Sequence, residues 1–437
     1  MKTQLGDVLE YTDRPWRASA ALVLVILISA MFAPSARAQS NKIVNLYSFN
    51  GTDGANPHAS VVVDWEGNIY GTTVEGGSSN ACQPNYAGCG VVFKLDKTGK
   101  ETVLHSFTNV PDGANPFSGV VLDFRGNLYG TTTGGGAYGN GTVFKVDQEG
   151  KETVLYSFGT VPDGNSPIGG LVFDLAGNLY GTTSGGGAYG NGGQVNCIQD
   201  DGESRCGTVF KLDPSGKETI LHSFNGTPDD GAQVSCLGPV CDGAFPAAGL
   251  TWDWAGNLYG TTAYGGSDET DTGTVFKIDP KTGNETVIYD LGYTDPQNPS
   301  AGVVLDGEGN IYGTTSNGGA AGNGAVYKID PAGNLTLLHS FTIPPDGLDP
   351  EGGLVLDLAG NIYGTTEYGG AAPYTGTVFK IDPKNGDETV LSFTGTPDGA
   401  FPAAGLSWDW AGYLYGTTSE GGAFGHGTVF KVERQAF

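Results

Sequence analysis

Short runs rich in β-branched and aromatic residues, separated by turn residues, recur along most of the chain. One copy contains four of them, "SGVVLD" (118–123), "NLYGTT" (127–132), "GTVFKVD" (141–147) and "ETVLYSF" (152–158). Residues of these types favour strands, and the Gly, Asn and Asp between the runs favour tight turns, so consecutive antiparallel strands are predicted. No window of ten or more residues after the amino-terminal segment has a helical period. The pattern predicts an all-β fold.

The four-strand unit is repeated seven times. Its most regular element is "GTT", found at 71–73, 130–132, 181–183, 260–262, 313–315, 364–366 and 416–418. Four-stranded units repeated at this length are typical of propeller blades. We therefore predict a single domain over residues 39–437, a seven-bladed β-propeller with four-stranded antiparallel blades.

The repeat is out of phase with the chain ends. The fourth strand type follows only the first six copies, and the seventh copy stops at "GTVFKVE" (427–433). A run of the missing type, "IVNLYSF", stands near the amino terminus. We predict that this strand, residues 43–49, pairs with the last blade, residues 404–432, and closes the ring, which would protect an edge that otherwise invites aggregation.

The repeat resembles that of the choice-of-anchor tandem repeat GloVer-containing proteins. The resemblance rests on "GNLYGTTxxGG", "GxGTVFK" and "ETVLYSF" and extends over nearly the whole chain after residue 38. It implies an exported or envelope-associated repeat protein with no established reaction. Members often carry a carboxy-terminal sorting anchor, whereas this chain ends in "KVERQAF", so surface attachment by such an anchor is not expected.

The first 38 residues have the pattern of a secretion signal. Arg14 and Arg17 precede an apolar run, residues 18–33, and "ARA" (36–38) is a small-x-small cleavage pattern. The run is shorter than the roughly 20 residues that a membrane-spanning helix needs. We expect an exported protein, secreted or associated with the periplasm or cell envelope, with no membrane insertion after the signal is removed.

The charge excludes one class of partner. The whole chain carries a formal net charge of −26, and the first 38 residues account for four cations and three anions, which leaves −27 for the rest. A surface this acidic repels phosphate backbones. Nucleic acid is therefore not expected as a partner. Separately, we expect the protein to be a monomer.

The six cysteines form three closely spaced pairs, Cys82 with Cys89, Cys197 with Cys206, and Cys236 with Cys241. An even count after an export signal favours disulfides. A zinc site would need paired C-x-x-C motifs or nearby histidines, and the chain has neither. We predict three disulfides within loop insertions, outside the core.

Positions that recur in every blade are interpreted as scaffold, because one ligand cannot use seven equivalent positions. The strand lysines, such as Lys145, are expected to pair with repeated acids such as Asp123, and His105, His222 and His339 are expected to fill space as aromatic rings. One aspartate per blade is expected to cap its own loop. The alternative is an axial Ca²⁺ site, since Ca²⁺ takes six to eight oxygens. The aspartates are Asp53, Asp112, Asp163, Asp242, Asp295, Asp346 and Asp398.

Symmetry breaks in the loops that join the fourth strand to the next blade and the second strand to the third. In propellers these loops share one face, and all three cysteine pairs lie in them. At the seam between blades 1 and 7 we expect His58 and Glu75 to approach Glu420 and His426. Such a group could ligate a metal or act as an acid and base. The alternative is that these are solvated loop polar groups.

Aromatic residues in the same loops could stack against sugars or pack on neighbouring blades. They are Tyr138, Tyr189, Tyr264, Tyr368 and Phe424. No nucleophile elbow, phosphate loop or zinc motif is present, and no cofactor other than calcium is suggested. We expect a binding scaffold for a glycan or protein on this face, with the uniform turns of the other face free to change. The alternative is an extracellular propeller hydrolase or lyase acting on polysaccharide.

Overall fold

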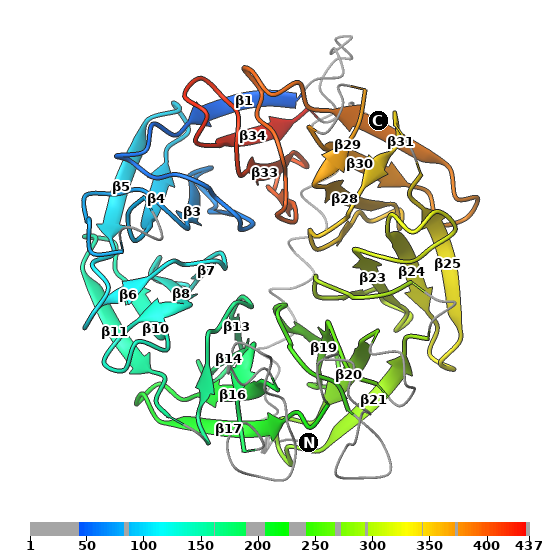
Figure 1. The fold of residues 1–437 in the computed structure, drawn as a ribbon, viewed down its shortest axis with the longest axis horizontal. Helices are drawn as coiled ribbons and strands as arrows, with labels where there is room; N and C mark the ends of the chain where they lie inside the picture. Colours follow the sequence, from blue (N-terminus) through cyan, green and yellow to red (C-terminus); the bar gives the residue numbers. More distant parts are fainter. Residues whose placement is uncertain are drawn as a thin grey trace, which may run out of the picture. The chain divides into compact units, whose positions relative to one another are not determined.

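The computed structural model describes residues 43–82, 87–160, 162–188, 206–226, 242–266, 272–292, 296–342, 344–371 and 375–433. They belong to the second of two compact units, Met1–Ser40 and Asn41–Phe437. Seven four-stranded antiparallel sheets surround a central axis (Figure 1). This confirms the predicted seven-bladed propeller.

Each blade runs from its innermost strand, a, to its outermost strand, d. Blade 1 contains β2 (Val62–Val63), β3 (Ile69–Thr73), β4 (Val91–Leu95) and β5 (Glu101–Ser106). Blade 2 contains β7 (Val121–Leu122), β8 (Leu128–Thr132), β10 (Thr142–Val146) and β11 (Glu152–Ser157). Blade 3 contains β13 (Val172–Phe173), β14 (Leu179–Thr183), β16 (Thr208–Leu212) and β17 (Glu218–Ser223). Blade 4 contains β18 (Thr251–Trp252), β19 (Leu258–Thr262), β20 (Thr274–Ile278) and β21 (Glu285–Asp290).

The remaining blades follow the same order. Blade 5 contains β22 (Val304–Leu305), β23 (Ile311–Thr315), β24 (Ala325–Ile329) and β25 (Leu335–Ser340). Blade 6 contains β27 (Val355–Leu356), β28 (Ile362–Thr366), β30 (Thr377–Ile381) and β31 (Glu388–Ser392). Blade 7 contains β32 (Ser407–Trp408), β33 (Leu414–Thr418), β34 (Thr428–Val432) and β1 (Ile43–Ser48), so the amino-terminal strand completes it.

Strand β1 has the register of a true d strand. Tyr47 pairs with Val429 and Asn45 with Phe430, with a bulge between them. Strand β5 bulges at the same place in blade 1, where His105 pairs with Val92 and Val103 with Phe93. Figure 1 shows β1 and β34, the two ends of the described chain, side by side. The predicted closure of the ring is confirmed.

The repeated "GTT" holds neighbouring blades together. Its first threonine donates a hydrogen bond to a carbonyl of the next blade, as in Thr72 to Ser118 O (2.8 Å) and, across the closure, Thr417 to Ala59 O (2.9 Å). Its second threonine donates within its own loop, as in Thr73 to Glu75 O (2.7 Å). These hydroxyls are buried, so their bonds remove an unfavourable desolvation.

Phenylalanines fill the interfaces between blades. Phe107, at the end of strand d in blade 1, meets Phe144 of strand c in blade 2 edge-on, with ring centroids 5.0 Å apart. Phe49 and Phe93 repeat the contact between blades 7 and 1, also at 5.0 Å. All four rings are fully buried. Edge-to-face pairs of this kind add to the stabilisation from burial itself.

The turns between strands a and b are held by their aspartates, as predicted. In blade 2, Asp123 accepts hydrogen bonds from the backbone of Arg125 and Asn127 and from the Tyr129 hydroxyl. The predicted pairing of Lys145 with Asp123 was wrong. Lys145 lies opposite Tyr129 in the register of β10 and β8, and its Nζ lies 5.7 Å from the centre of that ring. The aspartate is already satisfied within its turn.

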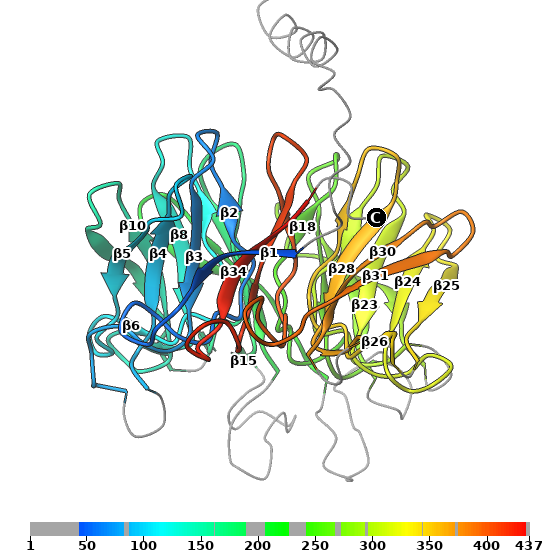
Figure 2. The ribbon, with the colours of Figure 1, turned by 90° about the horizontal axis from the view of Figure 1, so that it is seen from above.

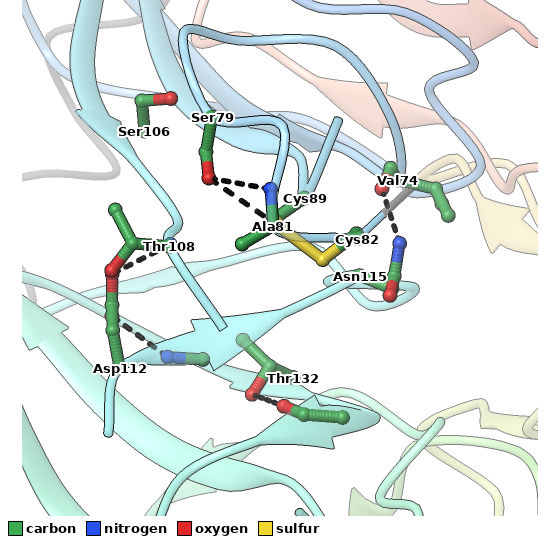
Figure 3. Close-up of a disulfide and its surroundings, with 12 residues drawn as sticks. Val74, Ser79, Ala81, Cys82, Cys89, Ser106, Thr108, Asp112, Asn115 and Thr132 are labelled. Atoms are coloured by element: carbon green, nitrogen blue, oxygen red, sulfur yellow. Dashed lines mark hydrogen bonds between the residues drawn. A yellow bond between two sulfur atoms is a disulfide. The ribbon is translucent and has the colours of Figure 1, made fainter. Parts of the chain in front are cut away.

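The Cys82–Cys89 disulfide is present in the loop between β3 and β4 (Figure 3). Cys89 is fully buried in a cluster with Phe107 and Phe144, so this disulfide reaches the core, contrary to the prediction. Cys206, which has the same place in its repeat, is disulfide-bonded as well. Cys197, Cys236 and Cys241 lie outside the described residues, so the other two pairings stay predictions.

Candidate functional site

On one face of the ring, the loop that enters each blade from strand d of the preceding blade pairs with the loop between strands b and c. We call this the loop face, and the two loops the d-to-a and b-to-c loops. In blades 2, 3 and 6 they form short sheets, β6 (Gly113–Ala114) with β9 (Gly134–Gly135), β12 (Gly164–Asn165) with β15 (Gly185–Gly186), and β26 (Gly347–Leu348) with β29 (Tyr368–Gly369). Single antiparallel bridges, such as that between Ala55 and Glu75, do the same in the other blades. Figure 2 shows β6, β15 and β26 on this face. The loops therefore have a rigid base.

A central cavity of about 630 Å³, which we call the central channel, is lined by the residues that lead into the seven a strands and by the first residues of β7, β18 and β22. Each blade contributes the residue after its loop proline, and six residue types occur among these seven. They are His58, Phe117, Ile168, Ala247, Ser300, Glu351 and Ala403. A volume of this size is within the usual range for small-ligand sites, about 300–1,000 Å³.

Three carboxylates of blade 6 form a group, and one of them, Glu351, lines the central channel. Asp349 and Glu351 precede β27, and Glu367 follows β28; one oxygen of each lies within 4.8 Å of the others. Burial raises the pKa of Glu351 to about 7, with Glu367 and Asp349 adding to the effect. Burial also raises the pKa values of Asp349 and Glu367. Burial thus favours the neutral, protonated form of all three carboxyl groups.

Asp349 stands where other blades use asparagine as a donor. Asn115 and Asn298, at the same place in blades 2 and 5, donate their side-chain amides to Val74 O and Ala263 O, both at 3.0 Å. A carboxylate can donate only when it is protonated. Oδ1 of Asp349 is buried with no hydrogen-bond partner among the described residues. This agrees with the raised pKa of Asp349.

The residues expected to meet at the seam of blades 1 and 7 have different surroundings. Burial lowers the pKa of His58, and the nearby charge of Glu75 opposes this effect. The His426 ring lies against Gly51, where an added Cβ would be 3.4 Å from Nε2. The charge of Glu420 acts on Glu367 of blade 6 and raises its pKa. His58 and Glu75 are half-buried, whereas Glu420 and His426 are exposed, and a meeting of all four stays a prediction.

The loop aromatics divide into two groups. Tyr138 and Phe424 are 66% and 62% exposed. Tyr264 packs on Phe245 and Tyr368 on Phe401, with ring centroids 5.8 and 5.4 Å apart. Tyr189 lies outside the described residues. Among the four described members of this set, Tyr138 and Phe424 are the exposed rings.

The repeated loop aspartates lie at the outer strands of the propeller. Asp112 accepts a hydrogen bond from Thr108 N, and its Oδ2 lies 3.1 Å from His105 Nε2 on β5. None of the six that the structure describes lines the central cavity, and Asp295 is not described. The expected loop cap is confirmed. The six described aspartates bond to the outer strands or within their own loops, which does not favour the alternative of an axial calcium site.

The outer-strand histidines are more than space-filling rings. His105, Asp112 and Glu152 of the next blade place their ligand atoms within 4.8 Å of one another, and His222, Asp242 and Glu285 do the same, as do His339, Asp346 and Glu388. Each group joins two blades. In other blades the same repeat position holds a tyrosine, and Tyr47 and Tyr156 donate hydrogen bonds to the loop aspartates Asp53 and Asp163. A polar group facing the loop aspartate at this position was the sequence signal for a contact with it.

These groups predict a stability that falls as the pH rises. Burial raises the pKa of the first residue of strand d to about 7 in five blades, at Glu101, Glu152, Glu218, Glu285 and Glu388. The folded state therefore binds more protons than the unfolded state between about pH 4.5 and 7, and this contribution is lost as the pH rises through 7. We expect the melting temperature, measured by calorimetry, to fall between pH 5 and 8.

The matched variant for this effect is Glu152→Gln, which removes one titrating group and should flatten the pH dependence. Blade 5 has Leu335 at the same place, so a neutral residue is compatible with the fold. The prediction would be contradicted if the melting temperature rose from pH 5 to 8, or if Glu152→Gln left the slope of melting temperature against pH unchanged. Either result would show that these glutamates stay ionised.

The comparisons with known proteins agree with this architecture. The sequence matches the Gloeobacter/Verrucomicrobia repeat over residues 35–237 and 245–436. The chain belongs to the Gloeobacter/Verrucomicrobia repeat family. No curated protein sequence matches this family member.

Solved structures with low sequence identity share the fold of this Gloeobacter/Verrucomicrobia repeat protein. The extracellular domain of a hybrid two component system from B. thetaiotaomicron is 13% identical, with a TM-score of 0.52 over 91% of this chain. The chain spans less than half of that structure, 43%. The oligogalacturonate lyase of Vibrio parahaemolyticus is 12% identical, with a TM-score of 0.51 over 90% of this chain and 92% of the lyase.

The face opposite the loop face has features that the sequence analysis missed. The second residue of the a-to-b turn is a large, highly exposed apolar residue in six blades, from Trp65 at 80% to Leu358 at 110%. The other four are Phe124, Leu175, Trp254 and Trp410. The signal was the residue after the turn aspartate, as in "DWEGN", "DFRGN" and "DWAGN".

Proposed function

We propose that this is an exported binding protein whose loop face holds a glycan at the mouth of the central channel. One observation carries the proposal: one residue from each blade, of six different types among the seven, lines a single cavity on an otherwise repetitive frame. Loops on a rigid scaffold are where binding usually occurs. The exposed rings of Tyr138 and Phe424 extend the surface on which a sugar chain could stack.

Export is supported by the buried Cys82–Cys89 disulfide, since such bonds persist in oxidising compartments. Among the residues that the structure describes, no helix is long and apolar enough to cross a membrane. The compartment, whether periplasm, cell surface or medium, is part of the proposal.

The test is a binding screen of the purified mature protein against neutral and acidic polysaccharides. Phe117→Ala, which empties one wall of the channel mouth, should weaken binding about tenfold. Leu358→Ala on the opposite face is the control and should leave the affinity unchanged. Binding that is insensitive to Phe117→Ala, or a ligand that proves to be a protein, would refute the proposal.

A polysaccharide hydrolase or lyase is the second candidate, because Asp349, Glu351 and Glu367 form an acid and base group with raised pKa values. Glu351→Gln would then lower product release about 100-fold or more while leaving binding nearly intact. Product release assayed in the same screen separates the two candidates. No release by the native protein excludes the enzyme.

A further inference from the structure

The exposed apolar residues of the a-to-b turns are not needed for the turns themselves. Each turn is held by its aspartate, and in blade 1 Asp64 accepts from the backbone of Glu66 and Asn68 and from the Tyr70 hydroxyl. Blade 5 forms the same turn with Gly307 at the apolar position, where Asp306 accepts from Glu308 N and Asn310 N. Large exposed apolar residues that the fold does not need often mark a binding surface.

Four of these six residues are aromatic, and three of the four lie in consecutive blades. Trp410, Trp65 and Phe124 belong to blades 7, 1 and 2, which the ring closure makes neighbours, and all three line one cavity of about 530 Å³. Its apolar lining also includes Val62, Leu104 and Leu122. Figure 2 shows β2, which leads to the first of these turns, toward the side opposite β6 and β15. We call this cavity the aromatic groove.

Polar groups surround the rings of the aromatic groove. Lys94, Arg125 and Gln148 line it together with the carboxylates of Asp64, Glu66, Asp123 and Asp147. The Arg125 guanidinium lies 5.3 Å from the Phe124 ring centre, within the range of a cation–π interaction. Flat rings at 80–93% exposure beside hydrogen-bond donors and acceptors fit a sugar, whose C–H faces pack on rings while its hydroxyls bond to polar groups.

We propose that the aromatic groove is a second ligand site that binds a neutral oligosaccharide by stacking on Trp65, Trp410 and Phe124. Neutrality follows from charge. The groove has four carboxylates against two cations, and the chain after residue 38 carries a net charge of −27. A uronate chain would be repelled. The site is on the opposite face from the channel mouth and does not depend on the function proposed for it.

The experiment titrates the purified mature protein with cellohexaose, xylohexaose, mannohexaose and hexagalacturonate, and follows heat and tryptophan fluorescence. At least one neutral hexasaccharide should bind, and hexagalacturonate should not. Trp65→Ala and Trp410→Ala should each weaken that binding about tenfold, which corresponds to roughly 1.4 kcal/mol. Their melting temperatures should stay unchanged, because the rings are exposed.

The propeller supplies a matched control in Trp254→Ala. Trp254 has the same place in the turn of blade 4 and is 95% exposed, but Leu175 and Gly307 flank it in blades 3 and 5. It should leave the affinity unchanged. Equal losses from Trp254→Ala and Trp65→Ala, tighter binding of hexagalacturonate, or no binding of any neutral hexasaccharide would overturn the proposal. A change of sedimentation in all three tryptophan variants would instead assign the apolar turns to contact with a second copy.

Discussion

Removal of residues 39–50, with the secretion signal kept, is expected to open the ring and produce a much less stable protein that self-associates. Strand β1 pairs along the whole of β34, and Phe49 after it fills the interface with Phe93 of blade 1. The deletion exposes the edge of β34 and empties the place of a fully buried ring. The free energy of unfolding should fall by more than the roughly 3–5 kcal/mol that one buried Phe→Ala costs.

Two variants make the closure test specific. Phe49→Ala gives the cost of the ring alone, and the deletion must exceed it in denaturant unfolding. Moving residues 43–50 behind Val432, joined by the c-to-d turn of blade 2, residues 147–151, should restore stability and the monomer. A deletion that melts like the native protein, or a relocated strand that restores nothing, would show that β1 does not close the ring.

The fold could be predicted because its information is local and repeated. The sequence of each blade contains the patterns of four strands and their turns. Where one copy is ambiguous, the other six indicate the same strands. Closure was equally accessible, since a strand type absent from one end of the chain is present at the other. The bulge shared by β1 and β5 is the structural counterpart of that match.

Side-chain contacts within and between blades could not be predicted in the same way, because they depend on which face of a strand a side chain occupies. Lys145 was assigned to Asp123, yet the register puts it opposite Tyr129. The His105 group needs Glu152 from the next blade, a neighbour that no local pattern indicates.

The sequence predicted which loops share a face, whereas the acidic group of blade 6 became visible only in the structure. The residues after the loop prolines line the central channel. The acidic group could be found in the sequence only by comparing three repeat positions across all seven blades at once. No single one of these carboxylates indicates a site. The group exists because blade 6 has Asp349, Glu351 and Glu367 together. The aromatic groove was missed because uniform turn length concealed variation at a single position within the turn.

The glycine of "GTT" is expected to be the least replaceable small residue of the repeat. In blade 2, a Cβ added to Gly130 would lie 2.6 Å from Cζ of Phe144, which is fully buried between blades. The φ of Gly130 is not positive, so the requirement is for space and not for backbone freedom. Gly130→Val should destabilise the protein by about 3 kcal/mol or more, because overpacking costs about 1–3 kcal/mol and valine adds more than one methyl group.

Gly170 provides the control, since a Cβ there would meet nothing within 4 Å and its φ is also not positive. Gly170→Ala should therefore unfold at the native denaturant midpoint, while Gly130→Ala unfolds earlier. Adding Phe144→Leu to Gly130→Ala should recover part of the loss, because the clash is with that ring and contacting residues do not act additively. Equal midpoints for the two alanine variants, or a double variant no better than the sum of its parts, would mean that the ring can move aside and that "GTT" is maintained for its threonines alone.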